Sequence, residues 1–151
     1  MSTIQDLRLR RFERSLTTPV TPLTVLHNGT SPDRMKIVYV ANRVDPCGGV
    51  RIILEHVTRL SAMGHDVTLM SSFPEPTWHE VQAHYLKIPF HGGLAEYLPV
   101  ADVVVATYWD QIRDLSRATP VVYFEQGDGH LFDELETRHA AIVRDHITLA
   151  Q

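Results

Sequence analysis

The stretch that decides the fold is residues 36–71, which read KIVYVANRVDPCGGVRIILEHVTRLSAMGHDVTLMS. Residues 36–41 form a continuous apolar, β-branched run, which is typical of a strand buried on both faces. A polar loop then ends in two glycines, apolar residues recur at helical spacing from Val50 to Leu60, and Gly64 stops the helix. Residues 67–70 form the next apolar run. The sequence therefore predicts two buried strands joined by a helix.

Strand and helix patterns continue to alternate after this unit. They predict, in order, an outer strand over 84–88, a short helix over 94–98, a strand over 103–106, a helix over 109–117, a strand over 120–124 and a helix over 131–142. Such alternation buries parallel strands between helical layers, and the rule of right-handed crossovers then favours an α/β fold with a Rossmann-like doubly wound parallel sheet. Residues 147–151 read as the start of another strand, so we expect a truncated domain, part of a larger unit.

Composition restricts the class of protein. A chain of 151 residues with 44 % hydrophobic and 21 % charged residues matches one globular domain. Its net charge of −4 argues against a general nucleic-acid binder, whose affinity depends on positive charge facing phosphates. The single cysteine, Cys47, excludes an internal disulfide, and the charged start of the chain does not fit a signal peptide. We therefore expect a cytoplasmic protein that does not bind nucleic acid.

The first 34 residues differ from the rest, so we divide the chain into an N-terminal arm and linker (1–34) and a Rossmann-like domain (35–151). Within the arm, residues 4–16 carry apolar side chains at loosely helical spacing among several arginines. A basic helix of this kind fits peripheral contact with an anionic membrane surface, because arginines meet lipid phosphates while leucine and phenylalanine insert. It also fits a helix that docks on the domain, or a solvated arm.

The first candidate site is the turn that carries Gly48, Gly49 and Val50. Ligands of open parallel sheets bind at the carboxyl ends of the strands, where this chain places the loops 42–49, 71–76, 107–110 and 125–130. Two glycines at the start of a helix leave backbone N–H groups uncovered, so a phosphate or a sugar hydroxyl can approach closely. The alternative is that the glycines only form a tight turn.

Further candidates follow the last two predicted strands. Tyr108 and Trp109 could stack on a sugar, although Trp109 fits the core as well. Glu125 and Gln126 open a polar, glycine-containing segment up to residue 130 that could hold substrate hydroxyls, or simply be a polar loop. We predict no metal site, because the histidines lack ligand spacing and cysteine partners. Cys47 fits a filler residue better than a nucleophile.

Two familiar nucleotide-binding motifs are absent. The dinucleotide fingerprint needs GxGxxG and an acidic residue at the end of the second strand, whereas the glycines here are adjacent and that strand runs into Ser71 and Ser72. A phosphate-binding P-loop needs Gly-Lys-Ser/Thr, which the sequence lacks. An NAD-dependent enzyme is therefore the weakest of the functions considered.

The segments Gly48-Gly49-Val50 and Gly64-His65-Asp66-Val67-Thr68-Leu69, with Leu54 and Leu60 between them, resemble the opening of the family 4 retaining glycosyltransferases of the GT-B type. The strands predicted within 101–106 and 120–124 are placed as in that family, and the resemblance covers residues 36–151. It implies two facing Rossmann-like domains, of which this chain is the N-terminal, acceptor-side one. It also implies catalysis without a metal or cofactor and a nucleotide-sugar as donor.

What the resemblance implies for the site is limited to the glycine loop and its surroundings. Gly48 and Gly49 would lie near the donor phosphates and the transferred sugar. Many members carry a histidine after the strand that matches 120–124, whereas this chain has Glu125 and Gln126, so no catalytic residue is assigned. The paired glutamates of the donor domain are also missing. The implied partners are a nucleotide-sugar, a glycan, lipid or other acceptor, and a C-terminal donor domain in cis or in trans.

Two functions are therefore expected. The first is the N-terminal domain of a glycosyltransferase that moves a sugar from a nucleotide-sugar to an acceptor hydroxyl and is incomplete alone. The alternative is a non-enzymatic Rossmann-like binding or regulatory module.

Overall fold

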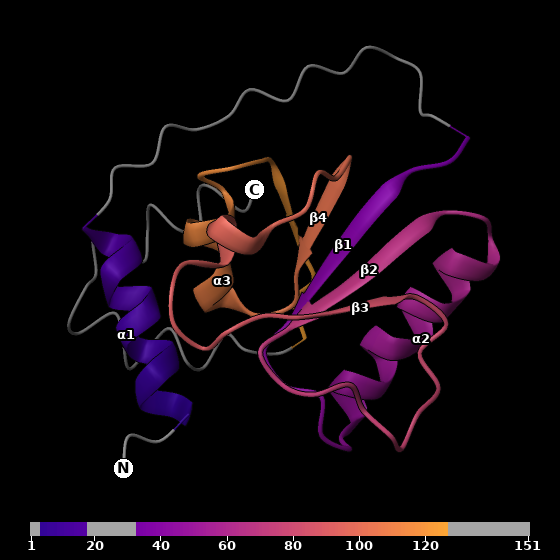
Figure 1. Ribbon diagram of the computed structural model, residues 1–151, viewed down its shortest axis with the longest axis horizontal. Coiled ribbons are helices and arrows are strands. Elements are labelled where there is room, and N and C mark those ends of the chain that lie inside the picture. The colour runs from indigo at the N-terminus through magenta and orange to yellow at the C-terminus, as the bar shows by residue number, and fades with distance from the viewer. Residues whose placement is uncertain (1–3, 18–32, 127–151) are drawn as a thin grey trace.

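The computed structural model describes residues 4–17 and 33–126 (Figure 1). Its elements are, in chain order, α1 (Ile4–Leu16), β1 (Lys36–Ala41), α2 (Gly48–Ala62), β2 (Asp66–Ser71), β3 (His84–Lys87), the 3-10 helix η1 (Leu94–Tyr97), β4 (Val103–Ala106), α3 (Trp109–Leu115) and β5 (Val121–Tyr123). Every strand predicted between residues 36 and 124 is present. The helix predicted over 131–142 and the strand over 147–151 lie outside the described residues.

The described strands form one parallel sheet in the order β3-β2-β1-β4-β5. The prediction of a Rossmann-like doubly wound α/β fold is confirmed. From the central β1 the chain moves outward to β2 and β3, then crosses back to β4 and β5 on the other side (Figure 1). The register pairs Ala41 with Ser71 and Val40 with Ala106, so the carboxyl ends of β1, β2 and β4 meet at one edge.

Alternating residues of β1 point into two separate hydrophobic clusters, one on each face of the sheet. Ile37 and Tyr39 pack in the cluster that α2 covers. Val38 and Val40 pack in the cluster on the other face, which receives side chains from α3 and η1. This explains why the sequence of β1 is a continuous apolar run rather than an alternating one.

α2 begins at Gly48 rather than at the predicted Val50, so the paired glycines are its first helical residues. The apolar spacing starts only at Val50, because glycine has no side chain to contribute to that pattern and a low helix propensity. Val50, Ile53 and Leu54 lie on the buried stripe of the helix. Gly64, with a φ of +95°, then takes the left-handed conformation that ends the helix.

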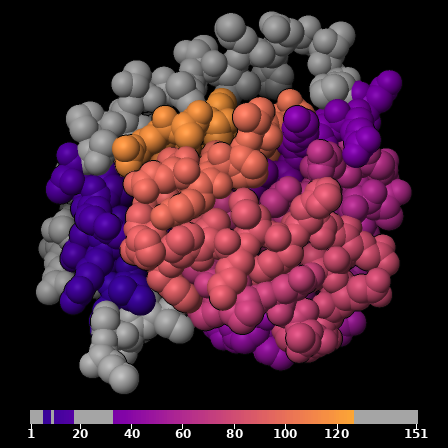
Figure 2. All heavy atoms as spheres, viewed as in Figure 1, coloured from indigo at the N-terminus to yellow at the C-terminus, as the bar shows by residue number. Residues whose placement is uncertain are grey.

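α1 docks on α3 and is part of the folded body (Figures 1 and 2). Phe12 is 1 % exposed and contacts Trp109 edge to face, with 4.9 Å between ring centroids. Arg113 of α3 donates to the backbone carbonyls of Ser15 and Leu16 at 3.1 and 3.5 Å. Trp109 is therefore a core residue. Of the alternatives for residues 4–16, the helix that docks on the domain matches this arrangement.

None of the helices in the described ranges has the length and apolar character needed to span a membrane. Phe12, which peripheral insertion would place in lipid, is packed inside the protein. Contact of the outer, arginine-bearing side of α1 with a membrane surface stays a prediction.

The packing of α2 can be tested by two substitutions on that helix. Leu54 is 1 % exposed and Ile52 is 49 % exposed. We expect Leu54→Ala to lower the free energy of unfolding by about 2–5 kcal/mol, because it leaves a cavity in the core. Ile52→Ala removes a residue of the same size from the surface and should cost less than about 1 kcal/mol. Urea unfolding measures both, and equal losses would contradict the buried stripe.

Candidate functional site

A pocket of about 230 Å³ lies where the strand order reverses, at the carboxyl ends of β1 and β4. The chain leaves β1 toward α2 on one face of the sheet and leaves β4 toward α3 on the other face. These diverging connections open a crevice at the place where doubly wound folds bind ligands. The residues that line the pocket are Asn42, Arg43, Cys47, Gly49, Val50, Ile53, Thr107, Tyr108 and Gln126.

The start of α2 borders this pocket through Gly49 and Val50. The first bond of the helix runs from the N–H of Arg51 to the carbonyl of Cys47 at 3.0 Å. The N–H groups of Gly48, Gly49 and Val50 precede that bond and have no carbonyl partner within the helix. Cys47 is the N-cap, makes no side-chain capping bond, and no acidic residue stands in the first turn. The positive end of the helix is therefore uncompensated.

The two glycines differ in their surroundings. A Cβ added to Gly48 would meet no atom within 4 Å, so this side of the turn is open. A Cβ added to Gly49 would lie 3.2 Å from Oε1 of Gln126, whose Nε2 donates to the Gly49 carbonyl at 3.1 Å. Gln126 therefore closes one side of the turn and leaves the side of Gly48 accessible.

The loop before the glycines is held by the body of the domain. Val44 is buried in the cluster under α2, and its carbonyl accepts a hydrogen bond from Nε1 of Trp78 at 2.7 Å. Arg43, beside it, is exposed and pairs with Asp45, with 2.7 Å between Nε and Oδ1. The hydrogen bond between the two raises the pKa of Arg43 and lowers the pKa of Asp45. Because both side chains are half exposed, this pair adds little stability.

A polar network joins the ends of β1 and β4 beneath the pocket. Gln111 is buried, and its Oε1 accepts from the backbone N–H of Thr107 at 2.9 Å and of Tyr108 at 3.2 Å. Its Nε2 donates to Oδ1 of Asn42 at 2.9 Å. Nδ2 of Asn42 donates to Oδ1 of Asp110 at 2.8 Å. The network fixes the positions of two pocket residues, Asn42 and Tyr108.

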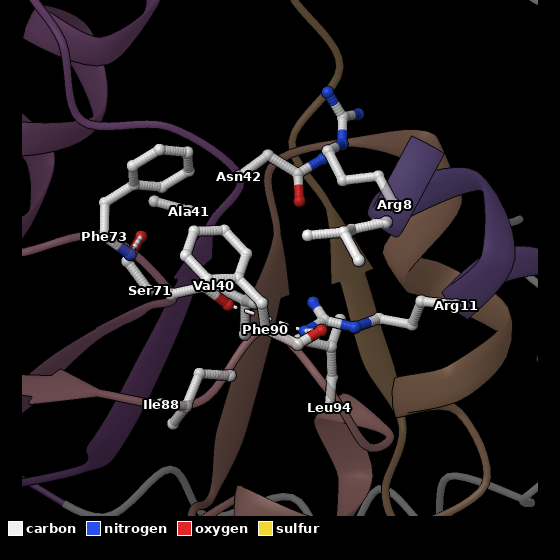
Figure 3. Close-up of a pocket in the computed structure, with 12 residues that line it drawn as sticks. Arg8, Arg11, Val40, Ala41, Asn42, Ser71, Phe73, Ile88, Phe90 and Leu94 are labelled. Carbon is white, nitrogen blue, oxygen red and sulfur yellow. Dashed lines mark hydrogen bonds between the residues drawn. The ribbon is translucent and has the colours of Figure 1, made fainter. Parts of the chain in front are cut away.

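On the other face of the sheet, α1 fills the carboxyl edge. Figure 3 shows Arg11 extending from α1 toward Phe90, and its Nη2 donates to the carbonyls of Phe90 and Pro89 at 2.9 and 3.3 Å. The space left between α1 and the ends of β1 and β2 is about 10 Å³, enough for roughly one water molecule. Burial lowers the pKa of Arg11, against the opposing attraction of Asp110 and Asp114. At the carboxyl ends of β1 and β4 the open space is therefore on the α2 face, and a separate open hollow of about 550 Å³ borders α1.

The structure brings most of the predicted site residues together. Gly49, Val50, Tyr108 and Gln126 line the same pocket, and Gly48 lies beside them at the start of α2. The side chain of Val50 is buried. Glu125 is exposed and does not line the pocket, and residues 127–130 lie outside the described residues.

Sequence reasoning did not single out Asn42, Arg43, Ile53 and Thr107 as lining residues. The usable signal was their position, because Asn42 and Thr107 directly follow the two strands between which the order reverses. Within residues 4–17 and 33–126, no group of three or more histidine, cysteine, aspartate or glutamate side chains could hold a metal ion.

Comparisons with protein-family models, with curated proteins and with solved structures found no match. The geometry of the pocket and the resemblance in sequence are therefore the grounds for a functional proposal.

The polar network can be tested at its centre. Gln111→Ala removes the acceptor of two backbone N–H groups, so we expect the free energy of unfolding to fall by roughly 2 kcal/mol or more. Gln82→Ala removes an exposed glutamine and should change it by less than about 0.5 kcal/mol. Urea unfolding compares the two variants. A small loss in Gln111→Ala would show that water satisfies these donors equally well.

Proposed function

We propose that this chain is the N-terminal, acceptor-side domain of a glycosyltransferase that uses a nucleotide-sugar donor. The single observation that carries the proposal is the N-terminus of α2, which has no side-chain cap and borders the pocket between β1 and β4 through Gly49 and Val50. Helix N-termini of this kind bind phosphate. The resemblance to family 4 retaining glycosyltransferases suggests that this phosphate belongs to a nucleoside diphosphate sugar.

The charge of the pocket supports an anionic ligand. Its lining, as far as the chain is described, contains Arg43 and no carboxylate. Asn42, Thr107 and Tyr108 add neutral polar groups. A phosphate would therefore meet a helix N-terminus and the guanidinium of Arg43, which is paired with Asp45, and no carboxylate stands among the described lining residues.

In the proposed reaction, the bond between the anomeric carbon of the sugar and the diphosphate oxygen breaks, and the acceptor oxygen bonds to that carbon. The nucleoside diphosphate leaves with the electron pair of the broken bond, and its leaving oxygen accepts the proton that the acceptor hydroxyl loses. The N–H groups of Gly48 and Gly49 would stabilise the charge that develops on the diphosphate. A donor domain, in cis or in trans, would hold the nucleoside.

A second candidate is a non-enzymatic Rossmann-like binding or regulatory module. It is favoured by the absence of any histidine, aspartate or glutamate from the described lining of the pocket, since these side chains are the usual general bases. An assay of sugar transfer distinguishes the two candidate functions. A glycosyltransferase domain transfers sugar when its donor domain is supplied and is inactive alone, whereas a binding module never transfers it.

A dinucleotide enzyme has less support. β2 ends in Ser71 and continues into Ser72, both buried, so no acidic residue stands there to hold ribose hydroxyls.

Titration of the 15N-labelled chain with UDP and UDP-glucose tests the phosphate site. We expect amide shifts at Gly48, Gly49 and Val50, with weak binding, on the order of 1 mM, because the donor domain is missing. Gly48→Ala should weaken binding about tenfold by blocking close approach. It should leave stability unchanged or raise it by about 1 kcal/mol, because the added Cβ meets open space.

A matched pair of charge changes controls for net charge. Arg43→Gln removes the cation that lines the pocket, and Arg59→Gln removes an exposed cation near the other end of α2. Only Arg43→Gln should weaken UDP binding. Wild-type protein that shows no amide shift at 48–50 with either compound, or that binds NAD there instead, would overturn the proposal.

A further inference from the structure

Arg8 of α1 contacts Asp110 and Tyr108 at the edge of the pocket between β1 and β4, which we call the switch-point pocket. We infer that Arg8 is a positioning residue for this pocket, so that docking of α1 sets the arrangement of Asn42 and Tyr108. The inference deepens the proposed function and rests on it for the identity of the ligand. The positioning itself can be measured without a ligand.

The first link is a carboxylate shared between α1 and the end of β1. Nε and Nη2 of Arg8 donate to Oδ2 of Asp110 at 3.2 and 3.1 Å. The other oxygen, Oδ1, accepts from Nδ2 of Asn42 at 2.8 Å. The side chains of Asp110 and Arg8 are only 10 % and 25 % exposed, so solvent screens this pair less than a surface pair. Both Arg8 nitrogens converge on Oδ2, so the carboxylate is held at one oxygen by Arg8 and at the other by Asn42.

The second link is the ring of Tyr108. The guanidinium carbon of Arg8 lies 4.3 Å from the centroid of that ring, within the range of a cation–π contact. Tyr108 lines the pocket from the side of β4, while Asn42 lines it from the side of β1. One arginine of α1 therefore contacts a pocket residue directly and holds a second one through Asp110.

The third link carries the effect to the backbone. Asn42 also accepts from Gln111, whose Oε1 holds the N–H groups of Thr107 and Tyr108. Loss of Arg8 removes the two hydrogen bonds that hold Oδ2 of Asp110, so the carboxylate is free to shift and draw Asn42 away from Gln111. The N–H groups of Thr107 and Tyr108 are therefore the local reporters of the Arg8 contact.

Other contacts hold α1 in place independently of Arg8. Phe12 packs on Trp109, Arg11 bonds to the carbonyls of Pro89 and Phe90, and Arg113 bonds to the end of α1. Removal of the Arg8 side chain should therefore alter the pocket without undocking the helix. Arg10 is exposed on the same helix and does not line the switch-point pocket, which makes Arg10→Ala a matched control.

Amide hydrogen exchange of the ligand-free 151-residue chain tests the inference. Arg8→Ala should accelerate exchange at Thr107 and Tyr108 by about fivefold or more, and leave Val57, in the middle of α2, unchanged. Arg8→Lys keeps the charge but not the pair of donors that converge on Oδ2 of Asp110, so it should restore part of the protection. Arg10→Ala should match the wild type.

Two results would overturn the positioning role. One is exchange in Arg8→Ala that equals that in Arg10→Ala. The other is equal acceleration at Val57, which would show general destabilisation. If Arg8→Ala does not fold, the same comparison is made with Arg8→Lys, where unchanged protection at Thr107 and Tyr108 would count against the inference.

Binding of UDP-glucose separates this inference from the proposed function. Arg8→Ala should weaken binding severalfold and Arg10→Ala should not. Wild-type protein that fails to bind UDP-glucose removes the proposed donor, while the exchange rates still decide whether Arg8 positions the pocket. Wild-type binding that Arg8→Ala leaves unchanged keeps the donor and overturns the link to Arg8.

Discussion

The burial of β1 on both faces is the constraint on which the rest of this structure depends. Its side chains enter two different hydrophobic clusters, so a helical layer must cover each face of the sheet. The connections from β1 and β4 therefore diverge to opposite faces, and a crevice opens between their carboxyl ends. The pocket is therefore a consequence of the division of the core into two clusters. Its polar residues Asn42 and Thr107 are the first residues after β1 and β4.

The fold could be predicted from the sequence because its signals are local. The apolar run at 36–41 reflects a strand buried on two faces, and the helical spacing after Val50 reflects a helix buried along one stripe. Both patterns can be recognised without knowing which elements pack against them. The pattern defines the first residue of α2 less sharply, because the helix opens with two glycines, which give no propensity signal. The same two residues, Gly48 and Gly49, were nevertheless identified as a candidate site, because their chemistry does not depend on the exact first residue.

The candidate site was predictable in part. Loops that follow parallel strands converge whatever their sequence, which brought Gly49, Tyr108 and Gln126 to one pocket. The role of α1 was not predictable, because it depends on contacts between residues about a hundred positions apart. Arg8 and Asp110 carry no local pattern that pairs them, and the arginines of residues 4–16 fit a lipid surface as well as a protein surface.

The contact of Arg8 with Asp110 also determines the electrostatics of the pocket. Asp110 holds Asn42, which lines the pocket, so its charge acts close to any ligand bound there. A lone carboxylate at this place would repel a phosphate and oppose the positive end of α2. Paired with Arg8 it contributes little net charge, as Arg43 does when paired with Asp45, and the positive end of α2 is then the main charge at the pocket. Asp110 can thus hold the ends of β1 and β4 in place without repelling an anion from the pocket, provided that Arg8 of α1 pairs with it.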